Sequence, residues 1–177
     1  MHRLFVALRP PKDVRDLLID AMEGADLRWQ DEDQLHLTLR FIGEVERPLA
    51  NDIAAALAAI AFPPFELGIS GAGRFDHGRR GALWAGIAPK NEVKAFAAKV
   101  ERACQFAGLE PERRAYHPHI TLARWSGGKP QLDLWMEQHS GLRSKPWPVR
   151  DFTLYESHLG RSGAHYTPIA SYPLVGI

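Results

Sequence analysis

Residues 35–42, Leu-His-Leu-Thr-Leu-Arg-Phe-Ile, alternate aliphatic and polar side chains, a pattern typical of a half-buried strand. Residues 118–124, Pro-His-Ile-Thr-Leu-Ala-Arg, repeat the pattern of residues 36–39, His-aliphatic-Thr-Leu. Each stretch follows a short apolar run that ends in proline, at residues 4–10 and 83–89. An amphipathic segment with helical spacing lies between that run and the motif in both cases, at residues 14–22 and 93–108. We therefore predict a duplicated strand–helix–strand unit.

The segments that follow the two units also correspond to one another. After the first unit we expect a helix at residues 48–60 and a strand at 65–70. After the second unit we expect a helix at residues 132–138 and a strand at 149–157. A last alternating run, residues 165–174, predicts a closing strand, and its two prolines favour a position at the edge of a sheet. No Gly/Ser-rich linker separates the halves. The sequence predicts one α+β domain over residues 1–177, built from two lobes with sheets at the centre.

Composition narrows the class of protein. The chain has 177 residues, of which 45% are hydrophobic and 24% charged, so extensive disorder is excluded. A formal charge of +1 excludes a broad cationic surface, and any contact with nucleic acid should be local. A single cysteine, Cys104, excludes an internal disulfide framework, and no apolar run is long enough for a membrane span. We expect a cytoplasmic protein that binds no membrane and is a monomer.

The distribution of threonine identifies candidate site residues. Only four threonines occur, and three of them lie two positions after a histidine. Two of these pairs, His36/Thr38 and His119/Thr121, occupy the same place in the duplicated unit, whereas the third, at residues 165–167, lacks the following leucine and is interpreted as a coincidence. Residues i and i+2 of a strand point to the same face. Paired across a twofold axis, the motifs would present two imidazoles and two hydroxyls to one cleft, an arrangement that suits in-line attack at phosphorus.

The paired motifs and their flanks resemble those of a known family. Besides the motifs, the resemblance covers residues 3–7, 41–44, 84–87, 117–124 and 166–174. The chain is similar to the two-histidine phosphoesterases and, within them, to the bacterial and archaeal RNA 2′,3′-cyclic phosphodiesterases, also called 2′-5′ RNA ligases. The resemblance implies a cleft between two antiparallel sheets with helices on the outside. It also implies hydrolysis of 2′,3′-cyclic phosphate termini to 2′-phosphates without a metal ion or other cofactor, and 2′-5′ ligation in some members.

The family's roles can be carried over residue by residue. His36 corresponds to the general acid that protonates the departing 3′ oxygen, and His119 to the base that activates water. Thr38 and Thr121 correspond to ligands of the phosphate oxygens, and Arg124 to a further phosphate contact. The near-symmetry of the motifs leaves the acid and base roles exchangeable. Strict alternation would turn Arg124 away from His119, so this role requires a bulge or a strand end.

Other side chains near the motifs are weaker candidates. His117 and His119 share a strand face and would suit zinc, but the sequence supplies only His36 as a third ligand, so we predict no metal site. Alternation places Arg40 on the face of His36, where it would reach phosphate or solvent, and places Phe41 in the core. Residues 71–81 are either a flexible basic loop that tracks phosphates or a solvated hairpin. The further substrate contacts considered are Arg40, Phe41, Phe75, Arg79, Arg80 and His117.

Two other functions remain open at this point. The chain could be a phosphate- or RNA-binding module without turnover, or it could apply the same chemistry to 2′-5′ oligoadenylate or a small cyclic nucleotide phosphate. In each case the expected partner is an RNA end or a nucleotide that carries a cyclic phosphate. The motifs recognise the phosphate alone, so the sequence leaves the base, the chain length and ligation in the cell undetermined.

Overall fold

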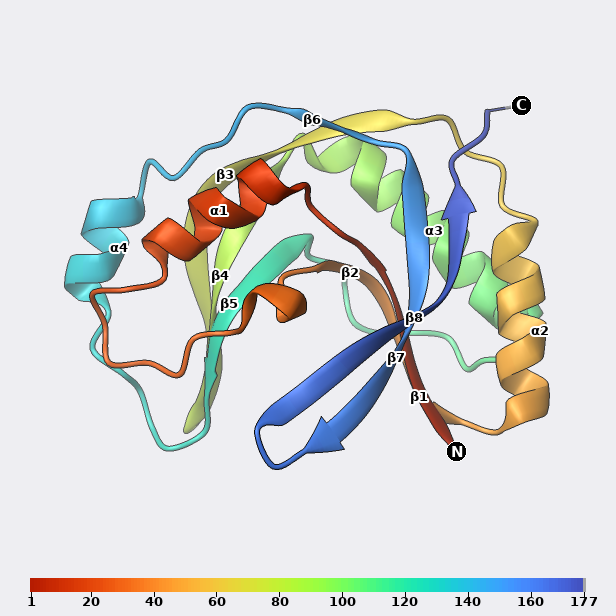
Figure 1. The fold of residues 1–177 in the computed structure, drawn as a ribbon, viewed down its shortest axis with the longest axis horizontal. Coiled ribbons are helices and arrows are strands. Elements are labelled where there is room, and N and C mark those ends of the chain that lie inside the picture. Colours follow the sequence, from red (N-terminus) through yellow and green to blue (C-terminus); the bar gives the residue numbers. More distant parts are fainter. Residues whose placement is uncertain (177) are drawn as a thin grey trace.

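The computed structural model describes residues 1–176, which form a curled antiparallel sheet with helices around it (Figure 1). Ile177, the last residue of the predicted domain, lies outside the described residues. In chain order the elements are β1 (His2–Leu8), α1 (Lys12–Ala21), the 3-10 helix η1 (Glu32–Gln34), β2 (Leu37–Val45), α2 (Arg47–Ala58), β3 (Phe65–His77), β4 (Arg80–Ala88), α3 (Lys90–Phe106), β5 (His119–Trp125), α4 (Asp133–His139), β6 (Trp147–Val149), β7 (Asp151–Gly160) and β8 (Gly163–Pro173). The predicted elements are all present, with ends that differ by a few residues in most cases.

The sheet consists of two antiparallel halves that meet at a narrow seam. Its strand order is β6-β3-β4-β5-β2-β1-β7-β8, and within the described residues all neighbouring strands are antiparallel. At the centre, β2 and β5 are joined by one residue pair, Leu37 opposite Ile120, and both side chains are fully buried. The α+β class with two antiparallel halves is confirmed. The two predicted sheets are joined edge to edge through this seam.

The halves exchange strands, which the repeat in the sequence did not reveal. The units β1–α1–β2 and β4–α3–β5 are the predicted duplicates. However, β3 follows the first unit and pairs with β4 of the second, whereas β7 follows the second unit and pairs with β1 of the first. The predicted strand at residues 149–157 is therefore divided at Arg150, because β6 pairs with β3 in one half and β7 pairs with β1 in the other.

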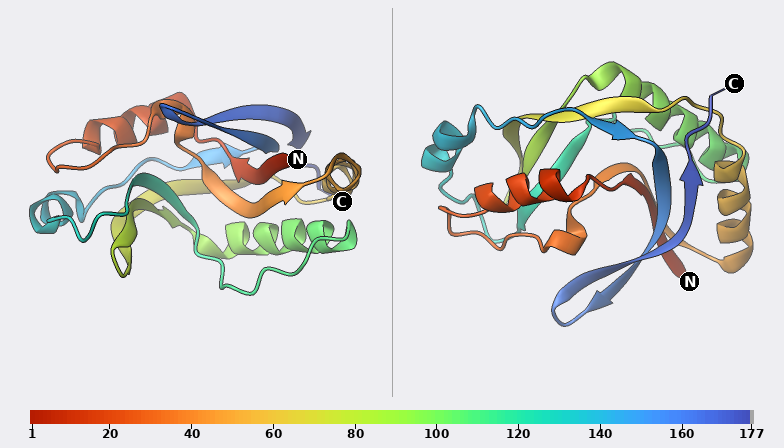
Figure 2. Two further views of the ribbon diagram at one scale, coloured as in Figure 1. Left: turned by 90° about the horizontal axis from the view of Figure 1, so that it is seen from below. Right: turned by 45° about the horizontal axis from the view of Figure 1, so that its top comes forward.

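The helices cover the sheet with apolar stripes that the 3.6-residue period of a helix produces. In α3 the buried side chains are Val93, Phe96, Ala97, Val100 and Cys104. Helix α1 buries Val14 and Leu18 in the same core, and α2 lies against α3. Figure 2 (left) shows α1 and α3 on opposite sides of the molecule. A fully buried Leu, Val or Phe contributes roughly 1.5–3 kcal/mol relative to exposure, and these stripes belong to one core that includes strands of both halves of the sheet.

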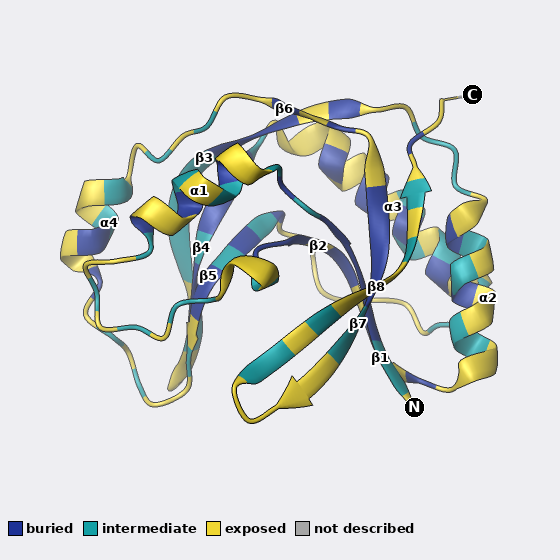
Figure 3. Cartoon of the chain, viewed as in Figure 1, coloured by how far each residue is buried: buried dark blue, intermediate teal, exposed yellow. Residues whose placement is uncertain are grey.

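Two long hairpins, β7–β8 and β3–β4, lie in opposite halves of the sheet. The hairpin of β7 and β8 extends beyond the body of the sheet (Figure 1), and its outer part is mostly exposed (Figure 3). Strand β8 lies at the edge of the sheet, as its prolines predict. The other hairpin, β3–β4, contains residues 71–81, so a flexible loop was the wrong prediction there and a hairpin the correct one.

The glycines of the β3–β4 hairpin make room for aromatic rings. A Cβ atom at Gly73 would collide with the indole of Trp84, and one at Gly81 would collide with the indole of Trp125. Glycine is required at these two positions because the rings lie directly over the backbone. Among the described residues, no helix is long and apolar enough to cross a membrane.

Candidate active site

A cavity of about 1180 Å³ lies where the two halves of the sheet meet. Both motifs line it, through His36 and Thr38 from the first half and His119 and Thr121 from the second. The pairing of β2 with β5 at the seam explains why the two motifs lie together. In the antiparallel register that pairs residues 37 and 120, each motif's histidine lies beside the other motif's threonine, on the face opposite the buried Leu37/Ile120 pair. The duplicated motifs are thus brought together by the one pair that joins the halves.

Both motif strands bulge directly after the threonine. The pairing of β5 with β4 skips Leu122, and that of β2 with β1 skips Leu39. Each bulge reverses the alternation, so the residue three positions after the threonine returns to the cavity face. On β5 this residue is Arg124, which lines the cavity as the predicted bulge requires. On β2 it is Phe41, which is 43% exposed and lines the cavity, so the prediction that Phe41 lies in the core was wrong.

The same bulge turns Arg40 to the other side of β2. Arg40 pairs with Val6 on the core face of β1 and is 8% exposed, so the prediction that it shares the face of His36 and Thr38 was wrong. Its guanidinium forms an ion pair with Glu101 of α3 and donates to the carbonyls of Phe41 and Glu110. Arg40 nevertheless lines the cavity, together with its partner Glu101.

His36 lies in a box of aromatic rings. Its imidazole centroid is 4.6 Å from that of Tyr155, 5.5 Å from that of Tyr166 and 6.1 Å from that of Phe5, each with the planes near perpendicular. The residue is 7% exposed, and among residues 1–176 its Nδ1 has no hydrogen-bond partner. Burial, and after it the positive charge of Arg9, lowers the pKa of His36 to about 4, although the nearby backbone of Gln34 opposes this shift in part. The neutral imidazole is therefore the stable form in the empty cavity at neutral pH.

His119 is held by a hydrogen bond that His36 lacks. Its Nδ1 lies 2.6 Å from the backbone carbonyl oxygen of His117. A carbonyl can only accept, so Nδ1 carries the hydrogen and the neutral ring keeps its lone pair on Nε2. Phe75 and Trp84 lie beside the ring, with centroids 5.0 Å and 6.0 Å from it. Burial lowers the pKa of His119, and the bond to the His117 carbonyl partly opposes this shift.

The weaker candidates divide into two groups. Phe75 and His117 line the cavity beside His119, as a substrate contact would require. Arg79 and Arg80 are not among the described residues that line the cavity. Both are exposed near the tip of the β3–β4 hairpin, where Arg79 donates to the carbonyl of Gly127. Their positions do not support the predicted contacts.

Several cavity residues were missed from the sequence. Tyr116, one residue before His117, donates its hydroxyl to the Thr38 carbonyl at 3.0 Å. Tyr166 lies inside the third His-x-Thr sequence, which was interpreted as a coincidence and whose own His and Thr are exposed. Phe5 and Tyr155 carry no local signal, because the pairing of β1 with β7 is what brings them to His36.

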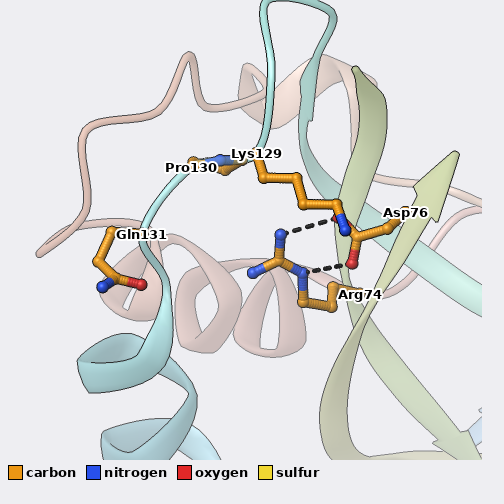
Figure 4. Close-up of a pocket in the computed structure, with 5 residues that line it drawn as sticks. All are labelled: Arg74, Asp76, Lys129, Pro130 and Gln131. Atoms are coloured by element: carbon orange, nitrogen blue, oxygen red, sulfur yellow. Dashed lines mark hydrogen bonds and ion pairs between the residues drawn. The ribbon is translucent and has the colours of Figure 1, made fainter. Parts of the chain in front are cut away.

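Other polar groups do not form a comparable site. No cluster of three or more His, Cys, Asp or Glu within residues 1–176 is arranged to hold a metal ion. A second, shallower pocket is lined by Arg74, Asp76, Lys129, Pro130 and Gln131 (Figure 4). There Arg74 donates two hydrogen bonds of 2.8 Å to Asp76, which leaves this pair of charges mutually satisfied. The cavity with the two motifs is the candidate active site.

Comparison with known proteins identifies the family. Residues 10–161 match the 2′-5′ RNA ligase superfamily. The chain belongs to this superfamily. The match spans both motif strands and all four α-helices of the described structure, so membership in the 2′-5′ RNA ligase superfamily rests on the chain from α1 to β7 rather than on one motif.

Individual relatives within the 2′-5′ RNA ligase superfamily agree with this assignment. The RNA 2′,3′-cyclic phosphodiesterase of Aeropyrum pernix is 33% identical over 82% of this chain and 85% of its own length. The protein of the same name from Geobacillus stearothermophilus is 34% identical over 89% of this chain, which spans about half (51%) of that relative. The structure of Escherichia coli LigT complexed with 3′-AMP has a TM-score of 0.79 and 27% identity over 98% of both chains. The fold of this superfamily member is thereby confirmed.

Proposed function

We propose that this chain hydrolyses RNA 2′,3′-cyclic phosphate termini to 2′-phosphomonoesters by acid–base catalysis between His36 and His119. The observation that carries the proposal is the meeting of the two His-x-Thr strands in one cavity. The names of the A. pernix and G. stearothermophilus relatives support the substrate class. The expected partner is an RNA end or a nucleotide with a cyclic phosphate, and we propose that the whole chain acts as one monomeric domain.

The phosphate would lie between the two motifs. Thr38 and Thr121 supply neutral hydroxyl donors for its non-bridging oxygens, and Arg124 supplies a charged donor on the His119 side. The attacking water and the departing 3′ oxygen occupy opposite sides of the phosphorus in an in-line displacement. Each histidine then serves one of these two oxygens, which matches the placement of one histidine on each half of the sheet.

The hydrogen bond to the His117 carbonyl supports His119 as the base. With Nδ1 donating, Nε2 of the neutral ring holds a lone pair and can accept a proton from the attacking water. As the new P–O bond forms, the bond between phosphorus and the 3′ oxygen breaks. The water proton passes to His119 and a proton of His36 passes to the 3′ oxygen, so the product carries a 2′-phosphate and a free 3′ hydroxyl. Proton exchange with solvent then restores both imidazoles.

His36 must be protonated to act as the acid, although burial lowers its pKa in the empty cavity. The substrate itself supplies the missing charge. A cyclic phosphate diester is an anion, and an anion beside a desolvated imidazole favours the imidazolium. The aromatic box around His36 makes this effect strong, because little water screens the charges there. Binding of substrate and protonation of the acid are coupled in this proposal.

Two finer points belong to the same proposal. The reaction needs no metal ion, because imidazoles, hydroxyls and one guanidinium supply the acid, the base and the anion-binding groups. If an RNA hydroxyl replaces water, the same groups support 2′-5′ ligation, since each step is reversible. Activity that survives EDTA would support the first point, whereas activity that requires an added divalent ion would contradict it.

The direct test incubates the purified protein with an oligonucleotide that ends in a 2′,3′-cyclic phosphate. We expect a 2′-phosphomonoester, identified by which hydroxyl keeps the phosphate. His36→Ala and His119→Ala should each lose at least ~100-fold in turnover, because each removes a general acid or base. His165→Ala, from the third His-x-Thr sequence on β8, is the matched control and should retain activity. Binding without a new phosphomonoester would favour a non-catalytic module and contradict the proposal.

A further inference from the structure

Arg40 lies in the wall of the cavity, and its guanidinium is hydrogen-bonded to the protein. The Nε atom donates to the Glu101 carboxylate, Nη1 donates to the Phe41 carbonyl at 2.7 Å, and Nη2 donates to the Glu110 carbonyl at 2.6 Å. These three acceptors come from α3, from β2 and from the connection at residues 107–118 that leads into β5. A guanidinium with donors in three directions is suited to fix three segments relative to one another.

Glu101 anchors the same connection at a second point. Its Oε2 accepts from the Gln105 side chain at 2.6 Å and from the backbone N–H of Glu112 at 3.1 Å. Burial alone would raise the pKa of Glu101, but the hydrogen bonds from Arg40, Gln105 and Glu112 outweigh it and lower the pKa. The carboxylate therefore stays charged near neutral pH. Arg40 and Glu101 together hold the connection at Glu110 and Glu112.

From these anchors the connection runs into the active site. Tyr116 donates to the Thr38 carbonyl at 3.0 Å, which ties the connection to the first motif. The next residue, His117, presents the carbonyl oxygen that lies 2.6 Å from Nδ1 of His119. Arg40 and His119 are thus connected through hydrogen bonds and a short stretch of backbone. This connection links the first motif strand to the histidine of the second motif.

We propose that Arg40 is a positioning residue, which holds residues 107–118 against β2 and thereby fixes the His117 carbonyl that orients His119. The proposal rests on the function proposed above, in which His119 acts as the base. It assigns to the arginine two positions after Thr38 a task unlike that of Arg124, which faces the phosphate side of the cavity. Loss of the Arg40 contacts would free the His117 carbonyl and leave the His119 ring free to rotate or to change tautomer.

The test separates positioning from phosphate binding. Arg40→Met, Glu101→Met and the double variant are compared for kcat, for KM with a 2′,3′-cyclic nucleotide, and for inhibition by inorganic phosphate. We expect each single variant to lower kcat about tenfold, because small displacements of a catalytic group are costly. The double variant should be no worse than the poorer single one. KM and the phosphate inhibition constant should change less than twofold, and Arg40→Lys should not restore kcat because lysine lacks the three-way fork.

The pH profile and a matched control complete the design. Weakening the bond to the His117 carbonyl removes an interaction that raises the pKa of His119. The part of the pH dependence of kcat that reflects titration of His119 should therefore move to lower pH in all three variants. Arg113→Met, an exposed arginine of the same connection, should match wild type. If Arg40→Met weakens phosphate inhibition about tenfold and Glu101→Met does not, Arg40 is a phosphate ligand and the proposal is wrong.

Two further measurements keep the test informative if a variant misfolds or if the proposed function is wrong. Tyr116→Phe removes only the bond to Thr38 and leaves no charge unpaired, so it should fold and lower kcat about threefold with the same shift in pH profile. Nitrogen-15 NMR of the imidazoles, without substrate, should show the Nδ1–H tautomer of His119 in wild type and a mixture of tautomers in Arg40→Met. An unchanged tautomer would overturn the positioning role. An inactive wild-type protein would instead overturn the proposed function and leave the NMR result to stand alone.

Discussion

The two halves of the active site have the same motif and the same bulge but different surroundings. The first half encloses His36 in aromatic rings, leaves its Nδ1 without a partner among the described residues, and presents Phe41 at the position after the bulge. The second half ties His119 to a backbone carbonyl and presents Arg124 at the equivalent position. The duplicated motif therefore determines where the two imidazoles lie, whereas the residues around each imidazole make their chemical environments different.

The largest contrast after loss of a histidine is expected between the two residues that follow the bulges. Arg124→Met removes a charged donor and should lower kcat/KM roughly 10- to 100-fold, since a hydrogen bond to a charged group contributes about 1.5–3 kcal/mol. It should also weaken inhibition by inorganic phosphate. Phe41→Ala should raise KM for a cyclic nucleotide by about tenfold, through lost stacking of about 1.4 kcal/mol, but leave phosphate inhibition unchanged. Equal effects on phosphate inhibition would show that the two halves bind the phosphate alike.

A second contrast concerns stability in acid. The unfolded chain protonates His36 near pH 6.5, whereas burial holds its folded pKa at about 4, so His36 lowers stability as pH falls below 6.5. His36→Phe should therefore be more stable than wild type at pH 4.5 by roughly 2–3 kcal/mol, after correction for the difference between the two proteins at pH 7.5. Urea unfolding at both pH values measures this gain.

His119→Phe provides the comparison for that experiment. Its gain in acid should be smaller, because His119 is less deeply buried than His36 and burial is the main cause that lowers both pKa values. If His36→Phe shows no additional stability at pH 4.5, the aromatic box does not keep that imidazole neutral. If both variants gain equally, the electrostatic difference between the halves is absent.

The smallest expected effect is the position of the pH optimum. Both histidine pKa values are lowered in the free protein, and kcat/KM reports the free protein. As pH rises through these values the acid loses its proton, so kcat/KM should be greatest below pH 6.5 and fall toward pH 8. The optimum of kcat, which reports the bound complex, should lie at higher pH because the phosphate favours the imidazolium. A kcat/KM optimum above pH 7.5 would contradict the lowered pKa values.

Local patterns were sufficient for the elements and for the centre of the site. The stripe from Val93 to Cys104 predicts α3, and the period of two in the motifs predicts that each histidine shares a face with its threonine. The need for a bulge before Arg124 also followed from strict alternation, and the structure contains that bulge at Leu122. These features depend on residues close together in the chain, which is why a single sequence contains them.

Features that depend on pairing between distant strands were not predictable in this way. The bulge at Leu39 has no mark in the sequence, so Arg40 and Phe41 were assigned to the wrong faces. The box around His36 combines residues from β1, β7 and β8, which meet because the halves exchange strands. The glycines of residues 71–81 suggested a flexible loop, although they admit the indole rings of a hairpin.

The measurement that tests the central claim most directly uses a cyclic phosphate in which sulfur replaces the 3′ oxygen. A thiolate leaves without protonation, so loss of the acid matters little with this substrate, whereas loss of the base matters as before. We predict that His36→Ala hydrolyses the sulfur substrate within about tenfold of wild type, and that His119→Ala remains at least ~100-fold impaired. Rescue of His119→Ala instead of His36→Ala would contradict the assignment of the two halves.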